Sequence, residues 1–173
     1  MTLRELLHGV TAESLAAIPV SGLACHSKQV RPGDAFVAID GSTTDGHAFI
    51  QEAIARGASA VIAQRFPATA PQGEPSRACP CVVVRDTREA LAVMTARFYG
   101  HPSRKLRLVG VTGTNGKTTI TYLLRAILEA AGQQAGLLGT IAYQIGGRVV
   151  PSTNTTPGPL ELQRYFAQMV AGG

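Results

Sequence analysis

The segment Gly113-Thr114-Asn115-Gly116-Lys117-Thr118-Thr119 constrains the fold more than any other part of the sequence. A phosphate-binding loop needs glycines so that main-chain N–H groups can turn toward an anion, a lysine that reaches the β- and γ-phosphates, and a hydroxyl that holds Mg²⁺. Gly113 and Gly116 would supply the turns, Lys117 the cation and Thr118 the hydroxyl. Such a loop joins a buried strand to the N-terminus of a helix, so the sequence predicts an α/β fold.

The residues around this loop have the required patterns. Residues 106–112 are almost fully apolar, which is typical of a strand inside a parallel sheet. A helix is expected over 117–131, with an apolar stripe and Gly132 at its end. Further on, we expect a second parallel strand at 135–139, a hairpin over 141–150 that turns at Gly146-Gly147, and a final helix over 159–170.

One position departs from the strict phosphate-loop pattern G-x-x-x-x-G-K-[ST]. That pattern requires a first glycine at position 111, where this chain has Val111. The structural alternative is a Gly-Lys-Thr string in an ordinary strand–helix turn. The apolar strand expected before the loop and the helix expected after it favour phosphate binding, because context is what confirms such a motif.

The first part of the chain alternates expected strands and helices, which is typical of a small α/β domain. Pro and Gly residues separate these elements, and Asp45 can cap a helix. The expected helices are 3–8, 47–56 and 87–99, and the expected strands are 34–39, 58–64 and 81–84. The helix over 47–56 would bury Phe49, Ile50, Ala53 and Ile54 on one face. We place the domain joint near residue 102.

Composition limits the function classes. Of 173 residues, 45% are hydrophobic and 16% charged, so the chain can bury a core. No apolar run approaches the roughly 18 residues that span a bilayer. The net charge of +5 is scattered and aromatic residues make up 5%, whereas nucleic-acid binding needs a basic face with stacking rings. We therefore expect a cytoplasmic monomer with small phosphorylated substrates, no nucleic-acid partner and no membrane partner.

The loop form Thr112 to Thr119, with no glycine at 111, resembles the ATP loop of the Mur ligase family. The same form occurs in folylpolyglutamate synthases and cyanophycin synthetases. Three further segments are similar to the Mur ligases that extend the muramoyl peptide by its third residue. They are residues 26–41 with 45–50, the helix 87–99 leading into His101-Pro102-Ser103, and Asn154-Thr155-Thr156-Pro157.

This resemblance implies two domains: a UDP-muramoyl-binding α/β domain over 1–102, and the beginning of a P-loop, parallel-sheet ATP-binding domain over 103–173, incomplete within these residues. It implies an ATP-dependent ligase that adds meso-diaminopimelate or L-lysine to UDP-MurNAc-L-Ala-D-Glu through an acyl phosphate, in peptidoglycan synthesis. The implied cofactors are ATP and Mg²⁺, and the implied partners are the UDP-MurNAc-dipeptide and an amino acid.

The resemblance also assigns residues. Gly113 to Thr119 would bind ATP, with Lys117 and Thr118 catalytic and Thr118 on the metal. Ser27, Ser42, Thr43 and Thr44 would contact the UDP part of the substrate, and Asn154, Thr155 and Thr156 the muramoyl dipeptide. Hydroxyls suit these roles because they both donate and accept hydrogen bonds. The alternative for each isolated Ser or Thr is a turn or cap residue.

The chain departs from the family at the UDP site, where Asp-Ser-Arg is usual and His26-Ser27-Lys28 stands here. Replacing arginine by lysine removes bidentate geometry. Other readings stay open. The chain could be a UDP-sugar binding module without chemistry, a folylpolyglutamate synthase, or a stand-alone P-loop NTPase or kinase. No Walker-B-like strand ending in Asp follows the loop, which disfavours the NTPase. We expect the chain alone to bind UDP or ATP weakly and not to ligate.

Overall fold

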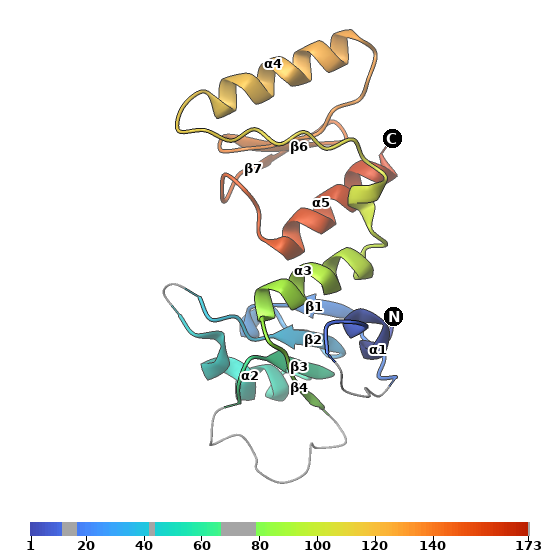
Figure 1. Ribbon diagram of the computed structural model, residues 1–173, viewed down its shortest axis with the longest axis vertical. Coiled ribbons are helices and arrows are strands. Elements are labelled where there is room, and N and C mark those ends of the chain that lie inside the picture. Colours follow the sequence, from blue (N-terminus) through green and yellow to red (C-terminus); the bar gives the residue numbers. More distant parts are fainter. Residues whose placement is uncertain (12–16, 42–43, 67–78, 173) are drawn as a thin grey trace. The chain divides into compact units, whose positions relative to one another are not determined.

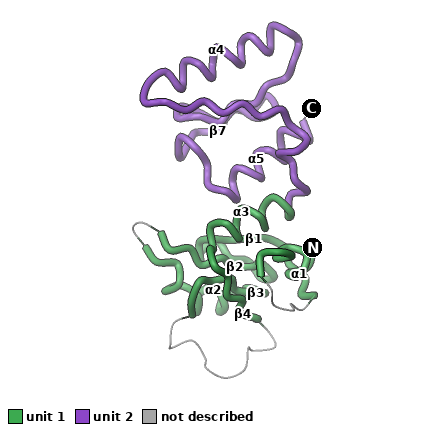
Figure 2. Tube along the Cα trace, in the orientation of Figure 1, with its two compact units in different colours: residues 1–98 green, residues 99–173 purple. Residues whose placement is uncertain are grey.

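A computed structural model describes residues 1–11, 17–41, 44–66 and 79–172 of the chain. It divides into two compact units, Met1–Phe98 and Tyr99–Gly173 (Figure 2). Each unit is described separately below. No helix in the described ranges is both long enough and apolar enough to cross a bilayer.

Unit 1 contains a four-stranded parallel sheet in the order β1-β2-β3-β4 (Figure 1). The strands are β1 (Gly22–Ala24), β2 (Asp34–Val37), β3 (Ala60–Ala63) and β4 (Cys81–Val83). Every residue of β2 and β3 is buried, as expected for central strands covered on both faces. The α/β class predicted from the sequence is confirmed by this sheet.

Helices cover both faces of this sheet because alternate strand residues point to opposite sides. Phe36 and Val61 pack with Ile50 and Ala53 of α2 (Ile50–Ala55) on one face. The alternate residues, such as Ile62, point to the other face, where α1 (Leu3–Leu7) contacts α3 (Thr87–Phe98).

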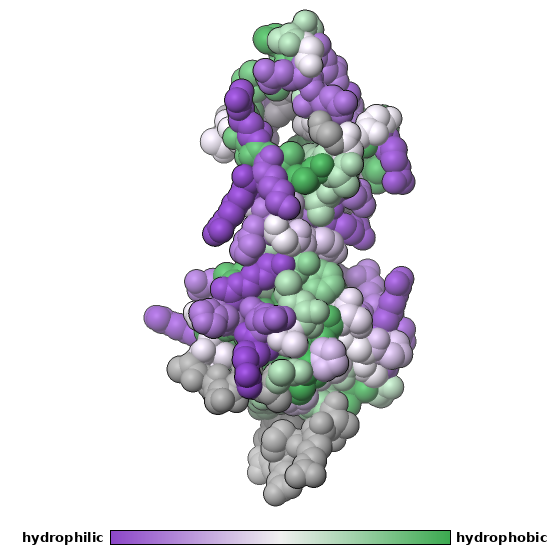
Figure 3. Space-filling view, turned by 90° about the vertical axis from the view of Figure 1, so that its right-hand side faces the viewer, coloured by the Kyte–Doolittle hydropathy of each residue, from purple (hydrophilic) through white to green (hydrophobic). Residues whose placement is uncertain are grey.

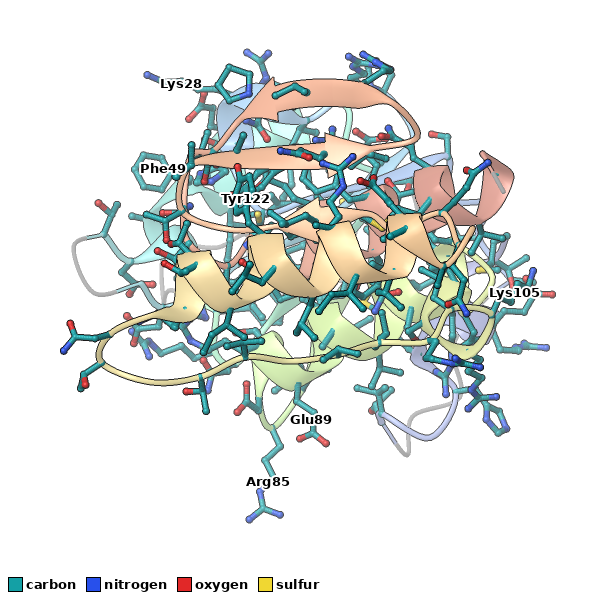
Figure 4. The ribbon with its side chains drawn as sticks, turned by 90° about the horizontal axis from the view of Figure 1, so that it is seen from above. Lys28, Phe49, Arg85, Glu89, Lys105 and Tyr122 are labelled. Carbon is teal, nitrogen blue, oxygen red and sulfur yellow. The ribbon has the colours of Figure 1, made fainter. Side chains whose placement is uncertain are left out.

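The sequence analysis was wrong about the start of the helix over 47–56. A 3₁₀ turn, η2 (Gly46–Phe49), precedes α2, and Phe49 is exposed rather than part of the apolar face (Figure 4). Asp45 caps the turn, as its position predicted, by accepting from the main-chain N–H of His47. Gly46 allows the turn because a Cβ there would lie 2.7 Å from the carbonyl oxygen of Ile39.

A capping box holds the short helix α1. Thr2 Oγ1 accepts from the N–H of Glu5 at 3.3 Å, and the Glu5 carboxylate accepts from the N–H of Thr2 at 2.7 Å. These hydrogen bonds satisfy two N–H groups at the helix start. A five-residue helix is unstable alone, so the complete burial of Leu3, Leu6 and Leu7 supplies the rest of its stability.

Unit 2 contains two longer helices and an antiparallel sheet. Its elements are η3 (Pro102–Arg104), α4 (Lys117–Ala130), β5 (Leu137–Leu138), β6 (Ala142–Ile145), β7 (Arg148–Pro151) and α5 (Pro159–Ala171). The predicted hairpin is confirmed as β6 and β7, joined through Gly146 (φ 52°) and Gly147 (φ 78°). Positive φ at both central residues matches a type I′ turn, which suits the twist of the strands.

Two strand predictions in unit 2 were wrong. Residues 106–112 form no strand, and Val109 is 65% exposed. A strand requires a paired neighbour, and none of the described residues pairs with this segment. Leu137–Leu138 does form a strand, but it runs antiparallel to β6. Only three residues separate β5 from β6, and a parallel pair needs a much longer crossover.

The adjacent residues Val82 and Val83 of β4 test the account of the core. Val82 is 1% exposed and Val83 is 46% exposed. We expect Val82→Ala to lower the free energy of unfolding by about 2 kcal/mol, because burial of two methyl groups is lost and a cavity remains. Val83→Ala should change it by less than about 0.5 kcal/mol. Urea unfolding followed by circular dichroism measures both, and equal losses would contradict this core.

Candidate functional site

The loop before α4 has the backbone geometry that its glycines predicted. Gly113 has φ 150° and Gly116, the N-cap of α4, has φ 76°. Both values are costly for residues with a Cβ. Lys117 turns back over the loop, and its Nζ donates to the Gly113 carbonyl oxygen at 2.5 Å. The ammonium group is therefore held at Gly113, in the loop that leads into α4, whose first-turn N–H groups have no partner within the helix.

Helix α4 presents much of its apolar stripe to solvent. No residue of the helix is buried, and Ile120, Leu123 and Ile127 are 47%, 58% and 64% exposed. Leu108 and Val109 in the preceding segment are exposed too. On the face of unit 2 that Figure 3 presents, hydrophobic residues lie at the surface among hydrophilic ones. The predicted phosphate loop is therefore formed locally, by its own glycines and by α4.

The predicted substrate residues Asn154, Thr155 and Thr156 lie in the connection from β7 to α5, and all three are exposed. A hollow of about 280 Å³ opens over this connection. Its lining residues are Thr140, Ser152, Thr153, Asn154 and Thr155. Thr140 Oγ1 donates to Thr155 Oγ1 at 3.2 Å, which joins the turn between β5 and β6 to this connection. The hollow is thus lined by four hydroxyl groups and one amide.

Tyr143 lies beneath the hollow and is completely buried. Its hydroxyl donates to the carbonyl oxygen of Asn154 at 2.5 Å and accepts from the N–H of Asn154 at 3.1 Å. Burial acts to raise the pKa of Tyr143. Hydrogen bonds from the Ser152 and Thr153 side chains and from the main chain outweigh that effect, so the pKa lies below its ordinary value of 10.0.

Figure 1 shows the loop before α4 and the connection from β7 to α5 on the same side of unit 2, the left of the view. Gln144 of β6 donates to the Tyr122 hydroxyl of α4 at 3.3 Å, so the helix that follows the phosphate loop is joined to the hairpin that leads to Asn154. Figure 4 labels Tyr122, which points from α4 toward this hairpin. The predicted ATP-binding loop and the predicted dipeptide-binding segment are therefore linked within unit 2 by the contact between α4 and β6.

In unit 1 the predicted UDP contacts follow the carboxyl ends of β1 and β2, the edge where open parallel sheets bind ligands. Ser27 begins η1 (Ser27–Gln29), is 7% exposed, and donates from Oγ to Glu52 Oε2 at 2.8 Å. Its oxygen remains available only as an acceptor. Thr44 is exposed, and its carbonyl accepts from the N–H of Gly41. Ser42 and Thr43 lie outside the described residues.

His26 and Lys28 flank Ser27 and are both exposed, and Figure 4 labels Lys28 at the surface. The Lys28 carbonyl accepts from Arg56 Nη2 at 2.9 Å. The side chains at the two positions where this chain departs from the family pattern are therefore directed at solvent, while Ser27 between them is held inside.

The sequence analysis did not identify a charged cluster beside Thr44. The ring of buried His47 contacts Asp45 Oδ1 at 2.5 Å, and His47 Nε2 accepts from the N–H of Gln64. Arg65 contacts Asp45 at 2.7 Å and Asp40 at 3.9 Å. Hydrogen bonds from the main-chain and ring nitrogens of His47, and then the charge of Arg65, lower the pKa of Asp45 below 3.8.

Thr140, Ser152 and Thr153 were also missed as lining residues of the hollow. Ser152 and Thr153 directly precede Asn154, so their position in sequence could have identified them. Thr140 lies 15 residues before Thr155 and contacts it only because β5, β6 and β7 pair in one sheet. No local pattern marks it.

Two family models match the chain. The model described as "Mur ligase family, catalytic domain" matches residues 19–99, and the one described as "Mur ligase middle domain" matches residues 111–173. The chain belongs to the Mur ligase family, with one model in each unit.

Curated relatives agree with this assignment. The chain is 41% identical over 98% of its length to UDP-N-acetylmuramoyl-L-alanyl-D-glutamate–2,6-diaminopimelate ligase 1 of Clostridium acetobutylicum. It is 43% identical over 100% of its length to the ligase of the same description from Caldanaerobacter subterraneus. The chain spans 35% of the length of each of these two relatives.

Solved structures share the fold. A UDP-N-acetylmuramoyl-L-alanyl-D-glutamate–2,6-diaminopimelate ligase superposes on the whole chain with a TM-score of 0.74 and 24% identity, over 34% of its own length. The MurF ligase of Thermotoga maritima in complex with ADP superposes on 86% of the chain with a TM-score of 0.52 and 28% identity, over 30% of its own length.

The lowered pKa of Asp45 predicts how stability depends on pH. A carboxyl group whose pKa is lower in the folded state stabilises the fold above its unfolded pKa, and that contribution is lost as pH falls through the folded pKa. We expect Asp45→Asn to lower the melting temperature at pH 7, and the difference from wild type to shrink as pH falls below 3.8. Thermal melting between pH 7 and about pH 2 measures this.

Glu89→Gln is the control for Asp45→Asn. Glu89 is an exposed carboxylate of α3 that projects into solvent (Figure 4). Its replacement should leave the melting temperature nearly unchanged at pH 7. A loss equal to that of Asp45→Asn, or a loss that does not shrink in acid, would show that the contacts of Asp45 with His47 and Arg65 do not stabilise unit 1.

Proposed function

We propose that the intact protein carrying this chain is a cytoplasmic ATP-dependent ligase of peptidoglycan synthesis, which adds meso-diaminopimelate or L-lysine to UDP-MurNAc-L-Ala-D-Glu. The observation that carries this proposal is the identity of 41–43% over almost the whole chain to ligases whose descriptions name that dipeptide and 2,6-diaminopimelate. Unit 1 would bind the UDP end of the substrate. Unit 2 would bind ATP and the muramoyl dipeptide.

The reaction divides into two steps. The carboxylate of D-Glu attacks the γ-phosphorus of ATP, which gives an acyl phosphate and ADP. The amine of the incoming amino acid then attacks the acyl carbon, and phosphate leaves from the tetrahedral intermediate. No protein nucleophile is needed, so catalysis consists of positioning and electrostatic stabilisation.

The phosphate loop suits the first step. Lys117 would leave the Gly113 carbonyl and neutralise charge on the β- and γ-phosphates, and Gly113 to Thr119 would surround the phosphates with main-chain N–H groups. The ADP bound to the MurF ligase of Thermotoga maritima supports a nucleotide in a related fold.

The donor set of the loop fits Mg²⁺. The half-exposed Thr118 side chain lies in the first turn of α4. A single protein oxygen is enough when phosphate oxygens and water complete the octahedron. When bound, the ion supplies further neutralisation of the transferred phosphoryl group. Among the described residues no group of three His, Cys, Asp or Glu side chains forms another candidate metal site.

Replacing Lys117 tests the proposal. In the intact protein, Lys117→Ala should lower kcat/KM for phosphate release about 100-fold or more, because a group that stabilises transferring charge is lost. Release should require ATP, UDP-MurNAc-dipeptide and diaminopimelate or lysine together. Lys105→Ala is the control, since it removes the same charge at an exposed position of unit 2 that projects outward in Figure 4, and it should leave the rate within about twofold.

Other outcomes identify the alternatives. Tight binding of the UDP-muramoyl dipeptide that is indifferent to Lys117→Ala, with no phosphate release by the wild type, would favour a binding module without chemistry. Phosphate release without any muramoyl substrate would favour a stand-alone NTPase. Turnover with a folate substrate instead of the muramoyl dipeptide would favour folylpolyglutamate synthase.

A further inference from the structure

Tyr143 is a completely buried side chain of unit 2 whose hydroxyl bonds to both main-chain groups of one exposed residue, Asn154. It donates to the carbonyl oxygen of Asn154 and accepts from the N–H of the same residue. Both polar groups of that peptide position are therefore satisfied from inside the fold. A connection between a strand and a helix usually pairs such groups with water or with its own residues.

The tyrosine ring is itself held rigidly. Tyr143 lies in β6, the central strand of the sheet, opposite Leu138 of β5 and Val150 of β7. Its ring packs against Tyr165 of α5, with ring centroids 5.2 Å apart and planes inclined by 56°. The hydroxyl position is thus fixed by both the sheet and the helix, and the position of Asn154 follows from it.

The same contacts leave the outward groups free. Among the described residues, the Asn154 side-chain amide has no hydrogen-bond partner, although its main chain has Tyr143 and Ser152, whose Oγ donates to the Asn154 carbonyl at 2.8 Å. Within the described ranges, the one hydrogen bond of the Thr155 side chain is with Thr140. The exposed amide and hydroxyl groups over the hollow are available to a ligand, and their direction is set from below.

We infer that Tyr143 is a positioning residue for the muramoyl-peptide end of the substrate: by binding both main-chain groups of Asn154, it orients the amide and hydroxyls of residues 154–156 for the ligand. This inference rests on the proposed function, because it takes those residues as the binding groups. Tyr143 itself touches no substrate. It acts by reducing the conformational freedom that binding would otherwise have to remove.

Tyr143→Phe tests the inference, with Tyr165→Phe as its matched control. Tyr165 is also a buried tyrosine of unit 2, but its hydroxyl has no hydrogen bond among the described residues. In the intact protein we expect Tyr143→Phe to raise KM for the UDP-muramoyl dipeptide about tenfold, since the Asn154 N–H loses its acceptor and the Asn154 carbonyl keeps only the Ser152 hydroxyl. KM for ATP should change less than twofold, and Tyr165→Phe should change neither constant.

Hydrogen exchange of the Asn154 amide supplies a readout that does not depend on activity. Tyr143→Phe should speed that exchange at least tenfold and leave the amides of β6 protected, whereas Tyr165→Phe should not. If Tyr143→Phe fails to fold, Ser152→Ala removes another hydrogen bond to the Asn154 carbonyl, and a KM increase of about threefold for the dipeptide is expected from it.

The possible failures are distinguishable. If the wild type turns over the muramoyl dipeptide but Tyr143→Phe matches Tyr165→Phe in both constants, the positioning role is wrong and the proposed function stands. Equal increases in KM for ATP and for the dipeptide would also overturn it, because they indicate a general loss of structure. If the wild type neither binds nor converts the dipeptide, the proposed function fails and the inference fails with it.

Discussion

Main-chain N–H and C=O groups that leave water must find partners, and this requirement determines how both units are built. In unit 1 it is met by four parallel strands, whose central members β2 and β3 are buried along their whole length. In unit 2 the β5-β6-β7 ladder meets it within the sheet, and the Tyr143 hydroxyl meets it for Asn154. Where no partner exists among the described residues, as over 106–112, the backbone forms no strand, and Leu108 and Val109 are exposed.

The loop before α4 and the connection from β7 to α5 are the two candidate binding regions of unit 2, and different interactions hold the backbone of each. Before α4, glycines let the backbone adopt conformations that other residues resist, and Lys117 bridges the loop. Between β7 and α5, a buried side chain fixes the backbone from inside. In unit 1 the backbone next to Thr44 is held by ion pairs and hydrogen bonds, because Asp45 contacts both His47 and Arg65. Polar groups that are held in a fixed direction would lower the entropic cost of binding a ligand at these candidate regions.

The sequence predicted best what depends on neighbouring residues. Gly146-Gly147 specified the hairpin turn, the glycines at 113 and 116 specified the loop, and Asp45 specified a cap, because each follows from local conformational preference. The sequence-based predictions were wrong where the structure depends on pairing between distant segments. An apolar run such as 106–112 becomes a strand only beside another strand, and β5 is antiparallel because it pairs with β6. The Tyr143 contact with Asn154 and the reach of Thr140 depend on three strands packing together, and no spacing in the sequence reveals them.

The transfer of oxygen from the substrate carboxylate to phosphate tests the central claim, ATP-dependent ligation through an acyl phosphate, most directly. The intact protein would be supplied with ATP, diaminopimelate or lysine, and UDP-MurNAc-dipeptide labelled with ¹⁸O in the D-Glu carboxylate, and the released phosphate analysed by mass spectrometry. The account predicts one ¹⁸O in each phosphate released, because the carboxylate oxygen that attacks ATP departs with it. Unlabelled phosphate formed together with the new amide bond would contradict an acyl phosphate.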